Sequence, residues 1–183
     1  TGSDLWNDNY SLAGNTFAIR KDSPTGEIVQ EMTTDENGHA ETPKEIANAL
    51  ELGTYYVTET KASHGFVNTF KPLKVELKYA NQTVALVTSN VKGQNQEVTG
   101  ETTLTKEDKD TGDKAQGKAV FEGTEYTLFT AKDGKAVKWS EAFKPEMVKG
   151  TKASDETVTL ALDEKNQAAV KHLAINEYYW QET

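Results

Sequence analysis

The sequence contains no cysteine and a single arginine, and these two shortages narrow the classes of function. Without cysteine the chain has no disulfide framework, Cys-ligated zinc, iron–sulfur cluster or thiol nucleophile, whatever the redox state of its compartment. Arg20 is the one arginine, and 29 acidic residues outnumber 20 Lys and Arg to give a formal charge of −9. A surface that neutralises phosphates is therefore not expected, and neither is a nucleic-acid partner.

Long hydrophobic runs are also lacking. A membrane-spanning helix needs roughly 18 consecutive apolar residues, and no stretch of the 183 residues reaches that length. No charged segment followed by an apolar one opens the chain as a secretory leader would. We expect no membrane insertion within this sequence and expect any targeting signal to lie outside it.

What the sequence has is the composition of β-strands. Threonine alternates with Val, Tyr and Phe, as in Thr54–Thr58 and Thr157–Leu160, and such residues suit a pleated, half-buried surface. Turn signals such as Asn37-Gly38 and Asp133-Gly134 separate these runs. The predicted class is an all-β sandwich with short helical insertions over 43–50 and 139–148.

An internal repeat predicts two domains. Leu52–Thr60 recurs as Ile175–Thr183 with Tyr-Tyr, Glu and Thr in the same register, and Gly14–Ile19 parallels Gly123–Leu128. The second copy is about 14 residues longer between these motifs, and residues 139–156 are the simplest place for the extra length. Units of this size can each bury a core, so the repeat indicates tandem domains, predicted as 1–95 and 96–183.

The repeated motifs resemble those of a known family. Leu104–Asp108 with Thr111-Gly112, the paired Gly14 and Gly123 segments, and Gly53–Glu59 are similar, in this order, to the Cna B-type (SpaA-type) domains of Gram-positive surface adhesins and pilins. The resemblance implies tandem transthyretin-like β-sandwiches. It also implies an autocatalytic Lys–Asn isopeptide bond assisted by a Glu, which is single-turnover self-cross-linking rather than enzyme activity and needs no cofactor.

Strand parity selects the residues for this chemistry. Alternation places Glu59, Glu182 and Lys106 on the faces that carry large side chains, namely Tyr55 with Val57, Tyr178 with Trp180, and Thr102 with Leu104. Burial is expected to lower the pKa of the lysine and to raise that of each glutamate. A neutral amine could then attack an Asn carboxamide while a protonated Glu transfers protons. The alternative for all three residues is an ordinary exposed charge.

Asn90 is the predicted carboxamide of the first domain, because it ends the strand Val84–Asn90 at the place of the family's last-strand Asn. A turn residue that ends a strand is the alternative. Each domain is expected to lack one reactant. No lysine precedes Lys21, and the sequence stops at Thr183 before a second Asn-bearing strand. Either the partners lie beyond these ends, or the opening strand of the first domain has degenerated and the domain forms no bond, or Thr1-Gly2-Ser3 stands where the true opening strand was removed.

The expected function is therefore that of a stalk or spacer in a wall-anchored surface adhesin or pilin, outside the bacterial cell. Neighbouring domains of the same chain are its expected partners, and other domains would bind a host extracellular-matrix or cell-surface ligand. The alternative is direct recognition of host protein or carbohydrate through residues 139–156. No metal site is expected, because the acidic run at Asp108–Asp113 lacks the spacing of a calcium loop and the three histidines are scattered.

Overall fold

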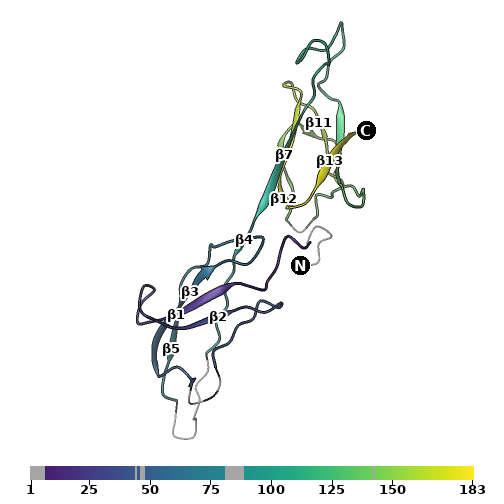
Figure 1. Ribbon diagram of the computed structural model, residues 1–183. Helices are drawn as coiled ribbons and strands as arrows, with labels where there is room; N and C mark the ends of the chain where they lie inside the picture. Colours follow the sequence, from purple (N-terminus) through teal and green to yellow (C-terminus); the bar gives the residue numbers. More distant parts are fainter. Residues whose placement is uncertain (1–6, 44, 46–47, 81–88, 142) are drawn as a thin grey trace. The chain divides into compact units, whose positions relative to one another are not determined.

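The computed structural model describes residues 7–43, 45, 48–80, 89–141 and 143–183. Strands and loops form two compact units (Figure 1). The first unit is Tyr10–Glu97, and the second unit combines Val98–Thr183 with Asn7–Asn9 from the start of the chain. Asn7 and Asn9 belong to the second unit because each side-chain amide donates to the carbonyl of Ile175 at 2.9 Å. The division lies two residues later than the sequence predicts.

The first unit is built on a four-stranded antiparallel sheet in the order β2-β1-β3-β5. Its strands are β1 (Thr16–Lys21), β2 (Ile28–Thr33), β3 (Gly53–Lys61) and β5 (Leu73–Leu77). A second, two-stranded sheet pairs β4 (Phe66–Val67) with β6 (Gln96–Glu97). Ala18, Ile19, Tyr55 and Val57 are buried in the core of this unit. The β4–β6 pair is what keeps Gln96 and Glu97 in the first unit.

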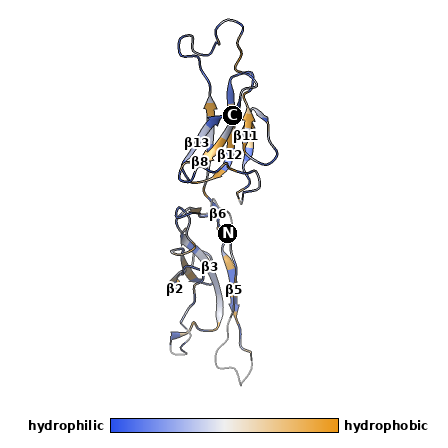
Figure 2. Cartoon of the chain, turned by 90° about the vertical axis from the view of Figure 1, so that its right-hand side faces the viewer, coloured by the Kyte–Doolittle hydropathy of each residue, from blue (hydrophilic) through white to orange (hydrophobic). Residues whose placement is uncertain are grey.

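The second unit is formed by two antiparallel sheets. One has the order β10-β11-β8-β13, with β8 (Glu125–Thr130), β10 (Thr151–Lys152), β11 (Thr159–Ala161) and β13 (Tyr178–Glu182). The other has the order β7-β12-β9, with β7 (Thr99–Thr105), β9 (Glu146–Lys149) and β12 (Gln167–Ala174). Hydrophobic colouring concentrates on β8, β11 and β12 (Figure 2), where Leu128, Leu160 and Val170 are fully buried.

The two units use the repeated motifs in the same way. In the first unit β1 pairs with β3 so that Phe17 lies opposite Glu59. In the second unit β8 pairs with β13 so that Tyr126 lies opposite Glu182. The register predicted from the repeat is therefore also the register of strand pairing, and it gives each glutamate an aromatic neighbour across the sheet.

The structure corrects the prediction of helical insertions. The structure is all-β and contains no α-helix in its described residues. The expected helix over 139–148 is replaced by turns and then by β9, which pairs with β12. Pro145 provides no N–H for a helix, whereas the exposed edge of β12 offers backbone partners to the segment that follows. The expected helix over 43–50 includes 44, 46 and 47, which lie outside the described residues.

Gly150 lets the chain pass from one sheet of the second unit to the other. It joins β9 to β10 with a φ of 90°. A Cβ at this position would lie 2.6 Å from the carbonyl oxygen of Ala161. A side chain is therefore excluded both by the left-handed backbone and by the close approach of β11.

Candidate functional site

Glu59 lies on β3 at the rim of the core in the first unit. The residues before it on the same face, Tyr55 and Val57, are buried, and Glu59 itself is half-buried. This is the alternation predicted from the sequence. The Oε2 atom of Glu59 is buried and has no hydrogen-bond partner.

Asn95 is the residue that faces this carboxylate. Its Nδ2 atom donates to Glu59 Oε1 at 2.5 Å. Asn95 directly precedes β6, and the backbone N–H of Gln96 donates to Thr69 Oγ1 at 3.0 Å, so the pairing of β6 with β4 fixes the position of the side chain. The Oδ1 atom of Asn95 is buried and, like Glu59 Oε2, has no partner.

Asn90, the carboxamide predicted from the sequence, lies elsewhere. It is exposed and lies outside the strands, and no hydrogen bond joins it to Glu59 within the described residues. Residues 84–88 of its predicted strand lie outside the described residues. Sequence reasoning missed Asn95 because the predicted boundary between the two domains falls directly after it. Burial alternates there, with Asn95 and Glu97 half-buried and Gln94 and Gln96 exposed, but all four residues are polar, so the sequence itself shows no alternation.

Two further polar groups adjoin the pair. The backbone N–H of Ser63 donates to Asn15 Oδ1 at 2.6 Å, and Asn95 Nδ2 lies 3.5 Å from the same oxygen. Ser63 is buried, and its hydroxyl has no partner. The first unit therefore encloses a small polar cluster of Asn15, Glu59, Ser63 and Asn95, in which three buried side-chain oxygens are unsatisfied. Such atoms are rare in folded proteins and call for an explanation.

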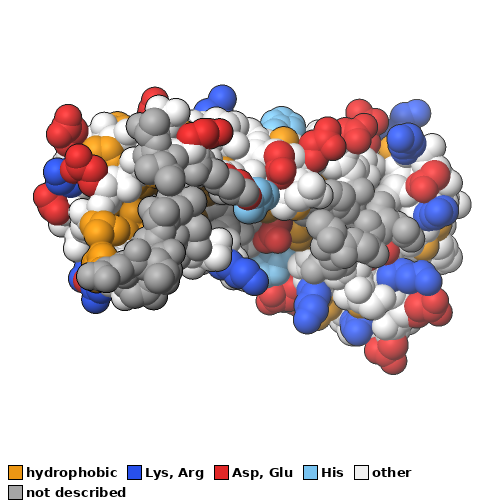
Figure 3. All heavy atoms as spheres, turned by 90° about the horizontal axis from the view of Figure 1, so that it is seen from below, with side chains coloured by type: hydrophobic (Ala, Val, Ile, Leu, Met, Phe, Trp, Pro, Cys, Tyr) orange, Lys and Arg blue, Asp and Glu red, His pale blue; other side chains and the backbone are white. Residues whose placement is uncertain are grey.

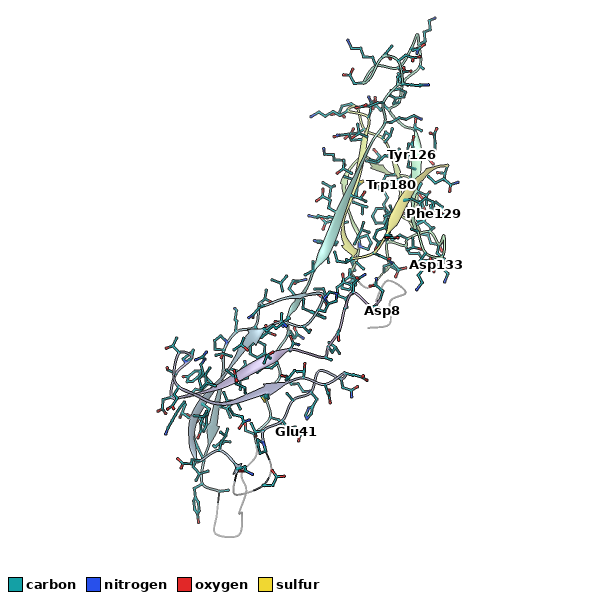
Figure 4. The ribbon with its side chains drawn as sticks, viewed as in Figure 1. Asp8, Glu41, Tyr126, Phe129, Asp133 and Trp180 are labelled. Carbon is teal, nitrogen blue, oxygen red and sulfur yellow. The ribbon has the colours of Figure 1, made fainter. Side chains whose placement is uncertain are left out.

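The second unit brings together Lys106 and Glu182, the two site residues that the sequence analysis names for it. Lys106 follows β7, Glu182 ends β13, and Nζ lies 2.9 Å from Oε2. Tyr126 OH donates to the same oxygen at 2.8 Å. The ammonium also lies 5.6 Å from the centre of the Tyr126 ring and 5.7 Å from that of Phe121. Figure 4 labels Tyr126 on β8 and Trp180 on the neighbouring β13.

The charge state of this pair differs from the expectation. The hydrogen bond between Lys106 and Glu182 lowers the pKa of Glu182 below its usual value and raises the pKa of Lys106 above its usual value. The expected neutral pair is therefore corrected to an ion pair. The physical reason is that solvent reaches both groups and stabilises their charges, because the side chain of Glu182 is 55% exposed and that of Lys106 is 26% exposed. Burial does raise the pKa of Tyr126.

A carboxamide next to Lys106 is the missing part in the second unit. Within the described residues, the ammonium of Lys106 has no hydrogen bond to an Asn or Gln side chain. The backbone N–H of Lys106 donates to the carbonyl of Asn166, whose own amide donates to the carbonyl of Asp113. The two units thus hold different parts of one set: a carboxylate with a carboxamide in the first, and a carboxylate with an amine in the second.

The insertion at 139–156 contributes to the core. Trp139 packs against the cluster of Leu160, Leu162 and Ala168, and its Nε1 donates to the carbonyl of Ser154 at 2.8 Å. Lys152 lies over the same ring at 5.0 Å. A tryptophan held in this way is part of the packing of the second unit.

Other chemistry finds little support in the described part of the chain. The carboxylate of Asp108 accepts the backbone N–H groups of Asp110 and Thr111, which makes the acidic run a closed turn. No group of three or more His, Asp or Glu side chains there could hold a metal ion. Nor is any helix in it long and apolar enough to cross a membrane. Figure 3 shows acidic and basic side chains interspersed over one face.

Comparisons with known proteins concern the fold of the chain. A family model described as the SpaA prealbumin-like fold domain matches residues 6–92. The solved TIE protein of Bacillus anthracis is 23% identical with a TM-score of 0.57, and the match covers 97% of this chain and 26% of that one, so the chain spans about a quarter of its length. At this identity the likeness is one of fold. No curated protein sequence matches the chain.

Two pilins are also similar. The major pilin subunit of Bacillus cereus is 18% identical with a TM-score of 0.37, and the match covers 95% of this chain and 54% of that one. A streptococcal ancillary pilin is 16% identical with a TM-score of 0.32, and the match covers 96% of this chain and 50% of that one. Their TM-scores are too low to carry an argument by themselves. The family match supports the predicted resemblance over residues 6–92, which are similar to the SpaA prealbumin-like fold domain.

Proposed function

We propose that this chain is a stalk or spacer region of a Gram-positive surface adhesin or pilin, outside the cell and attached to its wall. We further propose that its sandwiches are cross-linked by Lys–Asn isopeptide bonds, assisted by Glu59 in the first unit and by Glu182 in the second. One observation carries this proposal. Glu59 and Asn95 are hydrogen bonded at the rim of the core, and each retains a buried oxygen without a partner.

These two oxygens favour an amine as the missing partner. Glu59 Oε2, when ionised, and Asn95 Oδ1 can only accept hydrogen bonds. A buried acceptor without a donor destabilises a fold by about 1–3 kcal/mol. A lysine head group brings up to three N–H donors on a flexible stem, so one lysine could satisfy both oxygens.

The same geometry supports amide formation. A neutral lysine amine attacks Cγ of Asn95, a C–N bond to the lysine forms, and the bond from Cγ to Nδ2 breaks. The attacking amine loses one proton and the departing Nδ2 gains one, so ammonia leaves and the atoms balance. Glu59 is hydrogen bonded to Nδ2 and can carry that proton. Holding the reacting groups in fixed positions would accelerate amide formation, since effective molarities of well-oriented groups reach about 10⁵ M or more.

The internal repeat indicates where the amine of the first unit would come from. In the second unit Lys106 follows β7 and stands five residues ahead of Thr111-Gly112. Thr1-Gly2 stands ahead of Gly14 at a distance one residue longer than that of Thr111-Gly112 from Gly123. We propose that the first unit takes its amine from a strand like β7 located ahead of Thr1.

The second unit supports the same function from the other side. Lys106 and Glu182 are already in contact, and what they need is a carboxamide placed like Asn95. A strand that covered them would also remove solvent from the ion pair. Desolvation favours the neutral forms of both groups, which are the forms that amide formation requires.

A covalent link suits an extracellular stalk without cysteine. Joining the first and last strands of a sandwich limits how far a pulled chain can extend, much as a disulfide does, but without dependence on redox conditions.

The test is to supply the missing strand from the chain itself. A second copy of residues 98–110 is placed ahead of Thr1, so that a copy of Lys106 stands at the corresponding place. Intact-mass spectrometry should then find the chain lighter than its calculated mass by about 17 Da, the mass of one ammonia. Asn95→Ala should abolish the loss, and Asn90→Ala should leave it unchanged. An unchanged mass in the extended chain would refute the proposal.

A further inference from the structure

We propose that Asn15 is a positioning residue that fixes the orientation of the Asn95 carboxamide and turns its NH₂ group toward Glu59. The inference rests on the proposed function, because it concerns the group that leaves when the isopeptide bond forms. Asn15 directly follows the glycine of the repeated Gly14 and Gly123 motifs. The corresponding residue in the second unit is Thr124.

The orientation follows from a chain of donors and acceptors that begins at the backbone. The N–H of Ser63 can only donate, and it lies 2.6 Å from the side chain of Asn15. The atom of Asn15 that faces it must therefore be the oxygen, and Oδ1 is assigned there. A backbone group held by the fold thus sets the orientation of the Asn15 amide.

The same oxygen then sets the orientation of Asn95. Asn15 Oδ1 can only accept, so the atom of Asn95 that lies 3.5 Å from it must be the nitrogen. This Nδ2 also donates to Glu59 Oε1 at 2.5 Å. The two hydrogens of the NH₂ group are then divided between Glu59 and Asn15, and Oδ1 of Asn95 points away from both carboxylate and amide acceptors.

The orientation of the Asn95 carboxamide affects how ammonia would leave. With Nδ2 against Glu59, the carboxylate that collects the proton of the attacking amine is already in contact with the atom that must leave as ammonia. In the flipped orientation Oδ1 would face Glu59 and Asn15 Oδ1. An ionised Glu59 would repel it as a second acceptor, whereas a protonated Glu59 could donate to it, so Asn15 is the acceptor that opposes the flip in both states of Glu59. Asn15 therefore selects the orientation in which proton delivery to the leaving nitrogen is direct.

Hydrogen exchange in the chain of 183 residues tests the orientation without any bond formation. The side-chain N–H resonances of Asn95 are identified by their loss in Asn95→Asp, and the exposed Asn90 provides the reference. We expect the Asn95 protons to exchange at least tenfold more slowly than those of Asn90. Asn15→Thr, which installs the residue of the second unit, should remove most of that protection. Asn15→Asp should retain it at neutral pH, because a carboxylate accepts the same two hydrogen bonds.

Two controls separate positioning from folding. Ser63→Ala keeps the backbone N–H that orients Asn15 and should leave the protection unchanged. The backbone amide spectrum of each variant reports whether the first unit is folded. Full protection of Asn95 in a folded Asn15→Thr variant, or its loss in a folded Asn15→Asp variant, would overturn the inference.

The rate of cross-linking separates this inference from the proposed function. In the chain extended with residues 98–110, the mass is followed after refolding from urea. Asn15→Thr should slow the loss of ammonia about tenfold or more, and Asn15→Asp should restore it toward the rate of the parent. If the extended parent never loses mass, the proposed function fails and the exchange experiment still decides the role of Asn15. If the parent reacts and Asn15→Thr reacts equally fast, only the role of Asn15 fails.

Discussion

Asn95 Nδ2 lies 2.5 Å from Glu59 Oε1 at the rim of the core of the first unit. The two residues come from different sheets, since Glu59 lies on β3 and Asn95 directly precedes β6. The contact therefore ties the end of the first unit to its central sheet, and it places side by side the carboxylate and the carboxamide that the proposed isopeptide bond requires.

Asn95→Ala should destabilise the first unit, whereas Asn90→Ala should not. Removing the carboxamide leaves both oxygens of Glu59 without a donor, and a loss of about 1–3 kcal/mol in the free energy of unfolding is expected. Asn90 is exposed, so its replacement should change that free energy by less than about 0.5 kcal/mol. Urea unfolding followed through NMR resonances of the first unit measures both. Equal effects would contradict the assignment of Asn95.

The Lys106–Glu182 ion pair predicts a pH dependence of the second unit. The pKa of Glu182 is lowered from its usual 4.5, so its contribution to stability is complete above pH 4.5 and is lost as the pH falls through the lowered value. The pKa of Lys106 is raised from its usual 10.5, so its contribution is complete below pH 10.5 and is lost as the pH rises through the raised value.

Melting temperatures of the parent and of Glu182→Gln measure this dependence. The parent should melt higher between these limits, and the difference should vanish in acid and in strong base. A difference that persists at pH 2 would show that Glu182 acts by something other than its charge.

Tyr126→Phe should raise the pKa of Glu182 while the second unit stays folded. The phenol is the second of the two donors to Oε2, after Lys106. Phe17 occupies the corresponding place in the first unit, so the fold accepts a phenylalanine there. Carbon-13 NMR titration of the Glu182 carboxylate measures the shift, and Tyr179→Phe, on the same sheet but not bonded to Glu182, is the control. An unchanged titration curve would exclude the hydrogen bond.

Gly150→Ala should destabilise the second unit more than Gly112→Ala does. Both glycines have a positive φ, 90° and 75°, so both substitutions introduce backbone strain of about 1–3 kcal/mol. Only at Gly150 would the new Cβ meet a backbone atom, the Ala161 oxygen at 2.6 Å, whereas nothing lies within 4 Å at Gly112. Chemical denaturation should give a larger loss for Gly150→Ala by about 1 kcal/mol or more. Equal losses of stability would mean that backbone strain accounts for both effects and that the contact with the Ala161 oxygen adds nothing.

The sequence predicts those features of the fold that depend on periodicity and repetition. Alternation places Glu59 with Tyr55 and Val57, and the repeat aligns Glu182 with Glu59 in the register that strand pairing adopts. These features are local, since each depends on residues two apart along one strand or on two copies of one motif.

Asn95 could not be found in the same way. It lies in a polar stretch with a glycine, typical of a linker, and its role depends on β6 pairing with a two-residue strand about 30 positions earlier. Gly93 makes room for this course, because a Cβ there would lie 1.9 Å from the ring of Phe70. The charge state of Lys106 and Glu182 could not be predicted from the sequence either, because strand parity indicates the face on which a side chain lies and not its exposure to solvent.

The central claim is that Asn95 accepts the amine, and trypsin can decide it directly. Cleavage after Lys92 separates residues 79–92, which contain Asn90, from residues 93–106, in which Asn95 is the one asparagine. The measurement is tandem mass spectrometry of a tryptic digest of the chain extended with residues 98–110. The account predicts a branched peptide that joins the added lysine to residues 93–106 and lacks one ammonia. A branch on residues 79–92, or two linear peptides with no branch, would contradict it.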